Sequence, residues 1–138
     1  MKRILFPLVA ALLSSAVSAA PARPGPEGVW RNNKDSVRIR VTRCGGQSLC
    51  GRVVQASAEA REAAAAGGTD RLVGADLFRG LRLQEPSYWV GEVYVPDLGR
   101  TVEGSLAQTG PNTLVAEGCA IAGFGCKRQT WTRVGGAR

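Results

Sequence analysis

The side chains best able to do chemistry in this sequence are three glutamates in its second half, Glu92, Glu103 and Glu117. Each lies in a segment where polar and apolar residues alternate, which is the pattern of a half-buried β-strand. Paired carboxylates can bind a cation, and they perform the acid and base steps of glycoside hydrolysis. If the fold brings them together, these residues predict a cation site or a hydrolase.

Turn signals predict that the three glutamates lie on neighbouring strands. A loop over Pro96–Gly99 would place Glu92 opposite Glu103, and a loop over Gln108–Asn112 would place Glu103 opposite Glu117. Like charges that lie directly opposite on a sheet repel each other. The alternative to a functional site is therefore an outer or cavity-facing row that arginine neutralises.

The last hairpin is expected to supply that arginine. A bridge between Cys119 and Cys126 would place Arg128 opposite Glu117, and Tyr94 lies on the same predicted face. The candidate polar site therefore comprises Glu92, Tyr94, Glu103, Glu117 and Arg128. The same register predicts an apolar row on the other face of these strands, formed by Trp89, Leu106, Leu114 and Trp131.

Several kinds of catalytic machinery are excluded. The chain has no histidine, which rules out Ser-His-Asp and Cys-His nucleophiles and removes the commonest metal ligand. The glycine pairs Gly45–Gly46 and Gly67–Gly68 are predicted turns and do not form a phosphate-binding loop between a strand and a helix. We therefore predict a non-enzymatic protein with no catalytic residue, no metal and no cofactor.

The four cysteines predict two disulfides. Cys44, Cys50, Cys119 and Cys126 allow three pairings. Their spacing favours the two local pairs, Cys44–Cys50 and Cys119–Cys126, each of which would join the two strands of a hairpin. A zinc site of four thiolates is the alternative, but neither pair has the short spacing of a zinc knuckle.

The N-terminus is typical of a secretory signal peptide. Lys2 and Arg3 precede an apolar stretch over Ile4–Val17, and small residues around Ala19 and Ala20 offer a cleavage site. A bilayer-spanning helix needs about 20 apolar residues, so a retained anchor is the weaker alternative and no transmembrane segment is predicted. We expect residues 1–20 to be removed and the protein to be periplasmic or secreted.

The remaining chain is dominated by short strands separated by turn signals. A helical insertion is expected over Ala56–Ala66. Leu72–Leu83 is ambiguous and is expected to be an irregular crossover with room for one strand. The expected strands are Val29–Asn32, Val37–Thr42, Leu49–Gln55, Tyr88–Val95, Arg100–Ala107, Thr113–Cys119 and Arg128–Val134.

This pattern predicts an all-β fold, a small antiparallel up-and-down barrel of seven or eight strands. The barrel domain should span residues 28–135, after a flexible segment at 21–27 that is rich in proline. Because the domain is small, the alternative is that its large side chains fill the barrel and leave no ligand cavity.

A basic stripe accompanies the strand pattern. The formal net charge is +7, and Arg38, Arg40 and Arg52 stand at outward positions of two predicted strands. The stripe indicates either an anion-binding outer face or a solvated one. Aromatic residues do not alternate with these arginines, so a nucleic-acid partner is not expected.

An ordered series of short motifs resembles the bacterial family called domain of unknown function 2147. The motifs are Gly28-Val29-Trp30, Val37-Arg38-Ile39, Cys44, Leu49-Cys50-Gly51-Arg52-Val53, Leu72-Val73-Gly74, Gly91 to Gly99, Gly118-Cys119 and Gln129 to Arg133. The chain departs from the family pattern at Val95 and in the alanine-rich stretch Ala56–Asp70.

The resemblance implies an exported, lipocalin-like β-barrel with no established activity. Gly28 and Trp30 match the lipocalin opening motif, in which the tryptophan plugs one barrel end and an arginine of the last strand packs over it. Arg133, on the same predicted face as Trp131, is the expected partner through a cation–π contact.

The function expected from these observations is binding without catalysis. The ligand would be a small hydrophobic molecule inside the barrel or an anionic component of the cell envelope. The alternatives are a hydrolase or cation site at the glutamates, and a protein-interaction module whose contact segment is Leu72–Leu83. An apolar pocket favours the hydrophobic ligand, carboxylates converging in a cleft favour the hydrolase, and an exposed apolar patch without a cavity favours the module.

Overall fold

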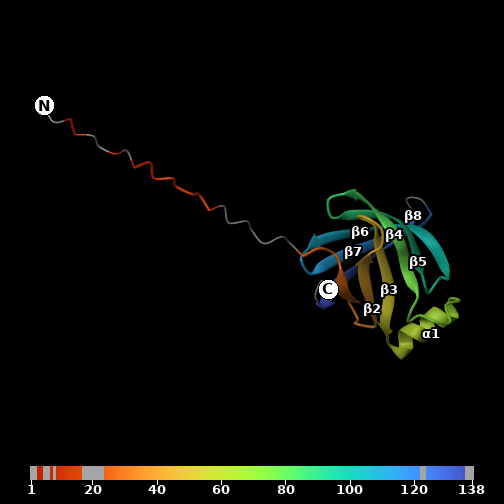
Figure 1. The fold of residues 1–138 in the computed structure, drawn as a ribbon. Helices are drawn as coiled ribbons and strands as arrows, with labels where there is room; N and C mark the ends of the chain where they lie inside the picture. Colours follow the sequence, from red (N-terminus) through yellow and green to blue (C-terminus); the bar gives the residue numbers. More distant parts are fainter. Residues whose placement is uncertain (1–2, 5–6, 8, 17–23, 122–123, 136–138) are drawn as a thin grey trace.

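The computed structural model describes residues 3–4, 7, 9–16, 24–121 and 124–135. Within them, eight antiparallel strands close into a barrel in which each strand pairs with the next and β8 pairs with β1 (Figure 1). This confirms the predicted all-β, up-and-down barrel with a short helical insertion. The elements are β1 (Gly28–Asn32), β2 (Val37–Arg43), β3 (Leu49–Ala56), α1 (Ala58–Ala66), β4 (Asp76–Glu85), β5 (Tyr88–Val95), β6 (Arg100–Gly110), β7 (Thr113–Ile121) and β8 (Phe124–Gly135).

Large apolar side chains fill the barrel. Trp30, Leu49, Leu106 and Leu114 are all at most 1% exposed, and they belong to one core cluster with the other inward-facing residues. Phe78 on β4 lies directly over Gly51 on β3, where a Cβ atom would come within 2.3 Å of the phenyl ring. The glycine is therefore needed for this close approach, and the ring occupies space inside the barrel.

The register of two hairpins agrees with the prediction. In the β5–β6 pair, Glu92 faces Glu103 and Trp89 faces Leu106. In the β7–β8 pair, Glu117 faces Arg128, and Cys119 faces Cys126 at the expected bridge. The first register follows from the turn signal at Pro96–Gly99, and the second follows from the Cys119–Cys126 bridge.

The predicted register of the hairpin between these two pairs is wrong. β6 continues to Gly110, which pairs with Thr113 across a two-residue turn, and not across the longer loop that was expected. Glu103 therefore faces Cys119, and Leu106 faces Ala116. Because the shift is two residues, each side chain stays on its predicted face.

The segment Leu72–Leu83, expected to be an irregular crossover with room for one strand, contains most of the strand β4. β4 begins at Asp76, and its pairing with β5 is interrupted between Phe78 and Arg82. Gly80 lies within this interruption with φ 87°, a conformation that favours glycine. The bend lets the strand turn around the barrel, and a bend of this kind is not visible in a periodicity pattern.

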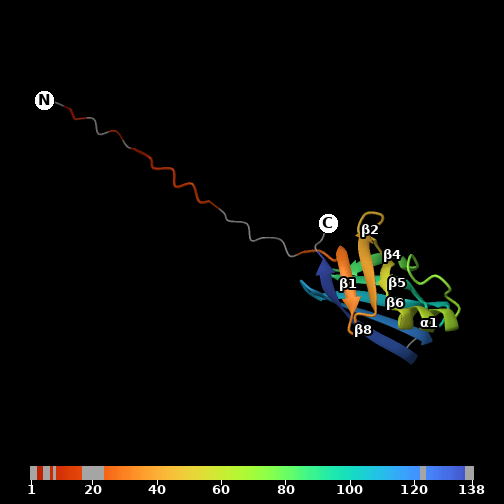
Figure 2. The same cartoon turned by 90° about the horizontal axis from the view of Figure 1, so that it is seen from below.

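The helical insertion lies outside the barrel (Figures 1 and 2). Ser57 caps α1 by accepting a hydrogen bond from the Ala60 amide at 3.1 Å. Gly67, just after the helix, lies against the backbone of Asp97, so closely that a Cβ atom would come within 1.9 Å of the Asp97 carbonyl oxygen. This contact fixes the loop after α1 against the β5–β6 turn.

The described residues before position 17 form neither helix nor strand, and they extend away from the barrel (Figure 1). Ile4, Val9, Leu12 and Leu13 are 79–94% exposed, so this apolar stretch contributes nothing to the core. The predicted cleavage site at Ala19 and Ala20 lies outside the described residues. In the part of the chain that is described, no helix is long and apolar enough to cross a membrane.

Part of the segment expected to be flexible at 21–27 is held against one end of the barrel. The Gln108 side-chain amide donates to the Pro24 carbonyl at 2.9 Å, and the Trp30 indole donates to the Pro26 carbonyl at 2.9 Å. Glu27 forms an ion pair with Arg43. Proline is tolerated here because these hydrogen bonds use only its backbone carbonyl as an acceptor, and proline lacks only the N–H donor.

Candidate functional site

The predicted motif residues form a closed barrel end. The Arg133 guanidinium carbon lies 4.3 Å from the centre of the Trp30 ring, the predicted cation–π contact. Arg133 also donates to the carbonyls of Gly25 and Glu27 at 2.6 and 2.7 Å. Burial lowers the pKa of Arg133, and the Glu27 carboxylate opposes this shift. Trp30 is fully buried, so the motif holds the structure together and offers no surface to a ligand.

Gly28 and Trp131 complete this motif. Gly28 starts β1 with φ 138°, a conformation that favours glycine, and it pairs with Val41. Trp131 is 4% exposed and pairs with Asn32 on β1 and with Leu114 on β7. Both residues therefore take part in the strand pairing that closes the barrel.

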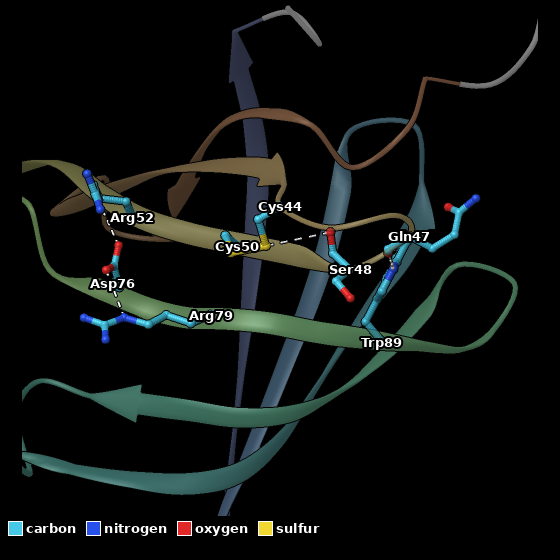
Figure 3. The surroundings of a disulfide bond; sticks show 8 residues. All are labelled: Cys44, Gln47, Ser48, Cys50, Arg52, Asp76, Arg79 and Trp89. Carbon is cyan, nitrogen blue, oxygen red and sulfur yellow. Dashed lines mark hydrogen bonds and ion pairs between the residues drawn. A yellow bond between two sulfur atoms is a disulfide. The ribbon is translucent and has the colours of Figure 1, made fainter.

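All four cysteines form the two predicted local disulfides, Cys44–Cys50 and Cys119–Cys126. Figure 3 shows the first, between the ends of β2 and β3. Glu117 lies close to Cys119 and Cys126, but neither sulfur can act as a thiolate ligand in the disulfide form.

The glutamates lie on the outer surface and do not converge in a cleft. Glu92 and Glu103 are exposed and face each other across β5 and β6. Glu117 pairs with Arg128 at 3.5 Å, as the neutralised alternative requires. Tyr94 lies on the same face as Glu92, and its hydroxyl is 2.6 Å from the Thr69 hydroxyl.

A hollow lies on the outer face where β4, β5 and β6 meet. It has a volume of about 430 Å³ and is open to solvent. The predicted residues Glu92 and Tyr94 line it, whereas Glu103, Glu117 and Arg128 do not. The other lining residues are Ala75, Asp76, Leu77, Phe78, Arg79 and Thr101.

A second hollow, of about 240 Å³, lies at the barrel end where residues 24–26 cross. Leu83, Pro86 and Trp89 form its apolar part, and Arg43 and Gln47 form its polar part. Trp89 is only 3% exposed, and its indole donates to the Gln47 carbonyl at 3.1 Å. Trp89 therefore forms a fixed part of the wall of this hollow.

A cluster of positive charge lies on the outer face of β1, β2 and β3. Arg31 on β1 faces Arg38 on β2, and Arg40 on β2 faces Arg52 on β3. Arg38 and Arg40 are two residues apart on one strand, so all four side chains share one face. We call these four residues the arginine face. Like charges placed directly opposite destabilise a sheet, so the cluster carries an energetic cost.

Two aspartates partly neutralise the arginine face. Asp35 accepts two hydrogen bonds from Arg38, at 2.9 and 2.8 Å. Asp76 on β4 pairs with Arg52 on the neighbouring strand β3 at 2.8 Å and with Arg79 on its own strand at 3.0 Å (Figure 3). The ion pairs of the described residues include neither Arg31 nor Arg40. The face therefore keeps an excess of positive charge.

Hydrogen bonds from the arginines, together with their positive charge, lower the pKa values of both aspartates. The hydrogen bond from Arg38 holds the pKa of Asp35 below its usual value. The hydrogen bond from Arg52 does the same to the pKa of Asp76, with a smaller contribution from Arg79, while burial opposes the shift. Both carboxyls are thus held in the ionised form by arginine.

Sequence reasoning identified Arg38, Arg40 and Arg52 but missed Arg31, Asp76 and Arg79. Arg31 could have been found, because a turn over residues 33–36 places it opposite Arg38. Asp76 and Arg79 could not, because they begin the irregular strand β4, where periodicity is weak.

These features define a closed, antiparallel, eight-stranded β-barrel with two local disulfides and a basic outer face. The family model described as an uncharacterized protein conserved in bacteria, DUF2147, matches residues 28–133. The chain belongs to this family. No curated protein and no solved structure matches the chain.

Proposed function

We propose that this protein is an exported, lipocalin-like, non-enzymatic barrel that binds a phosphate-bearing component of the cell envelope through the arginine face. The observation that carries this proposal is the facing pairs Arg31–Arg38 and Arg40–Arg52. An arrangement that costs stability in the free protein is relieved when phosphate groups lie between the guanidinium groups. Arginine suits this role because its planar group can bind two phosphate oxygens at once.

Export is part of the proposal. The charged N-terminus, the apolar stretch that lies outside the core and the two disulfides support it. In an exported bacterial protein, the nearest abundant phosphate groups are those of the lipid headgroups. The ligand class therefore follows from charge and compartment together.

The other expected functions have less support. The filled core does not favour a hydrophobic ligand inside the barrel. The exposed glutamates, with Glu117 paired to Arg128, do not favour hydrolysis. Within Leu72–Leu83, the leucines Leu72, Leu77 and Leu81 are buried, and the exposed apolar residues Val73 and Leu83 lie at opposite ends of the segment, which does not favour one continuous apolar contact surface.

Vesicle binding by arginine variants tests the proposal. An arginine near an anionic membrane contributes about 1 kcal/mol, so Arg40→Gln should weaken binding to phosphatidylglycerol vesicles about fivefold. The double variant Arg31→Gln/Arg40→Gln should weaken it about 30-fold. Arg100→Gln is the matched control, because Arg100 is exposed on β6, on the other side of the barrel. If Arg100→Gln weakened binding as much as Arg40→Gln does, net charge alone would drive binding, and the proposal would fail.

A further inference from the structure

The hollow between β4, β5 and β6 carries charges of both signs on facing strands. Phe78 on β4 pairs with Val93 on β5, and the pairing is interrupted beyond this point. Arg79 and Glu92 are the residues next to this pair on the two neighbouring strands. Both line the hollow. Opposite charges at such positions usually pair with each other.

Here they do not pair. Arg79 bonds through its Nε to Asp76, which Arg52 holds from the other side (Figure 3). The ion pairs among the described residues leave Glu92 without a cation, and the residue opposite it on β6 is Glu103, a second carboxylate. The structure therefore presents an exposed carboxylate beside a guanidinium whose partner lies elsewhere.

Arg79 still has hydrogen-bonding capacity. A guanidinium has five N–H donors, and the bond to Asp76 uses the one on Nε. The side chain of Arg79 is 79% exposed, so its terminal amino groups face solvent at the hollow. They can bind a phosphate while Asp76 keeps the guanidinium in place.

The other side of the hollow suits a small cation. The Tyr94 hydroxyl is held by Thr69, which fixes the position of the ring beside Glu92. A carboxylate together with an aromatic ring binds ammonium groups through charge and cation–π attraction. Thr101, opposite Tyr94 on β6, adds a hydroxyl.

We infer that this hollow binds a zwitterionic amino-alkyl phosphate, with the phosphate on Arg79 and the ammonium on Glu92 and Tyr94. A purely anionic ligand would be repelled by Glu92, and a purely cationic one by Arg79. The inference rests on the proposed function, since it gives the ligand class of an envelope phosphate bound beside the arginine face. The volume of about 430 Å³ lies in the range of small-ligand sites.

An NMR titration with O-phosphoethanolamine tests this inference on the mature protein with its disulfides intact. We expect saturable shifts at the amides of Glu92, Tyr94 and Thr101. The affinity should be at least tenfold higher than for inorganic phosphate or for ethanolamine alone, because each fragment engages only one side of the hollow. Equal affinity for phosphoethanolamine and inorganic phosphate would overturn the inference.

Two glutamate variants form a matched pair. Glu92 and Glu103 are both exposed and face each other, but only Glu92 lines the hollow. Glu92→Gln should lower the affinity for phosphoethanolamine about tenfold, and Glu103→Gln should leave it within twofold. Equal effects of the two substitutions would overturn the assignment of Glu92. Thermal melting of both variants verifies that each remains folded.

Two further measurements separate this inference from the proposed function. Binding to phosphatidylethanolamine vesicles would indicate a lipid headgroup as the ligand, and binding to soluble O-phosphoethanolamine alone would indicate the free compound. If the protein binds neither of them, the inference is overturned. Arg31→Gln/Arg40→Gln should weaken phosphatidylglycerol binding and leave the phosphoethanolamine titration unchanged. If wild-type protein fails to bind phosphatidylglycerol but keeps the titration, the proposed function fails and the hollow remains a binding site.

Discussion

At the scale of single residues, arginine has two opposite roles in this protein. Arg133 is partly buried, contacts the Trp30 ring and donates to backbone carbonyls, so it closes the barrel. Arg40 is exposed and faces a second arginine, so it adds no stability to the sheet. The first role is explained by the structure alone, and for the second we propose a ligand.

Trp30→Ala should destabilise the protein by about 3–5 kcal/mol, because it removes a fully buried aromatic side chain and leaves a cavity. The Arg133 guanidinium would also lose its cation–π contact with the Trp30 ring. Urea unfolding followed by circular dichroism measures the change, and Trp30→Phe should cost less because it keeps a ring. A variant with alanine that unfolds like wild type would show that Trp30 does not close the barrel.

Asp76→Asn should destabilise the protein at neutral pH by about 0.5–1 kcal/mol, since its arginine partners are largely exposed. The pKa of Asp76 is lowered in the folded state, so its stabilising effect is present above the unfolded value of about 3.9. That effect is lost as the pH falls through the folded-state pKa. Melting temperatures from pH 7 to pH 2.5 should therefore converge for wild type and variant at the acid end, and a constant difference would contradict the role of the ion pair.

At the scale of strands and turns, the predictability of the fold depended on local signals. The β5–β6 hairpin was predicted because Pro96–Gly99 is an unambiguous turn. The β6–β7 hairpin was predicted two residues out of register, because Gly110 and its neighbours are compatible with two loop lengths. β4 was missed as a regular strand because Gly80 bends it and alternation fails there. The part of the candidate site that lies on β4, Asp76 and Arg79, was missed for the same reason.

The β5–β6 pair offers a test at this scale. Glu103→Gln removes one of two carboxylates that face each other, and it should stabilise the protein by about 0.2–1 kcal/mol at neutral pH. The gain should shrink in 0.5 M NaCl, because salt screens charges at the surface. Thermal melts at low and high salt measure both effects. Destabilisation by this substitution would show that Glu103 has a favourable partner.

At the scale of the whole molecule, binding is proposed for the outside of the barrel and not for its interior. Three tryptophans and Phe78 belong to one core cluster, and the two hollows described above are open to solvent, with Trp89 and Phe78 in their walls. The outer face of β1–β3 carries the excess positive charge, and the N-terminal apolar stretch contributes nothing to the core. The sequence predicted the barrel and the possibility of a filled core, but not where charge would gather once the sheet had closed.

The exported form should begin at Ala20 or Pro21 and contain two disulfides. The intact mass of protein recovered from the periplasm or medium should match removal of the first 19 or 20 residues. It should be unchanged by alkylation without reduction, because all four cysteines are bridged. A full-length mass would contradict the predicted signal peptide, and added alkyl groups would contradict the bridges.

The measurement that tests the central claim most directly is the affinity of the mature wild-type protein for phosphatidylglycerol vesicles at increasing salt. The arginine face predicts binding at 50 mM NaCl that weakens at least tenfold by 500 mM, because salt screens charges at the membrane surface. Phosphatidylcholine vesicles should bind little at either concentration. Absence of binding at 50 mM NaCl, or equal binding to both lipids, would contradict the account.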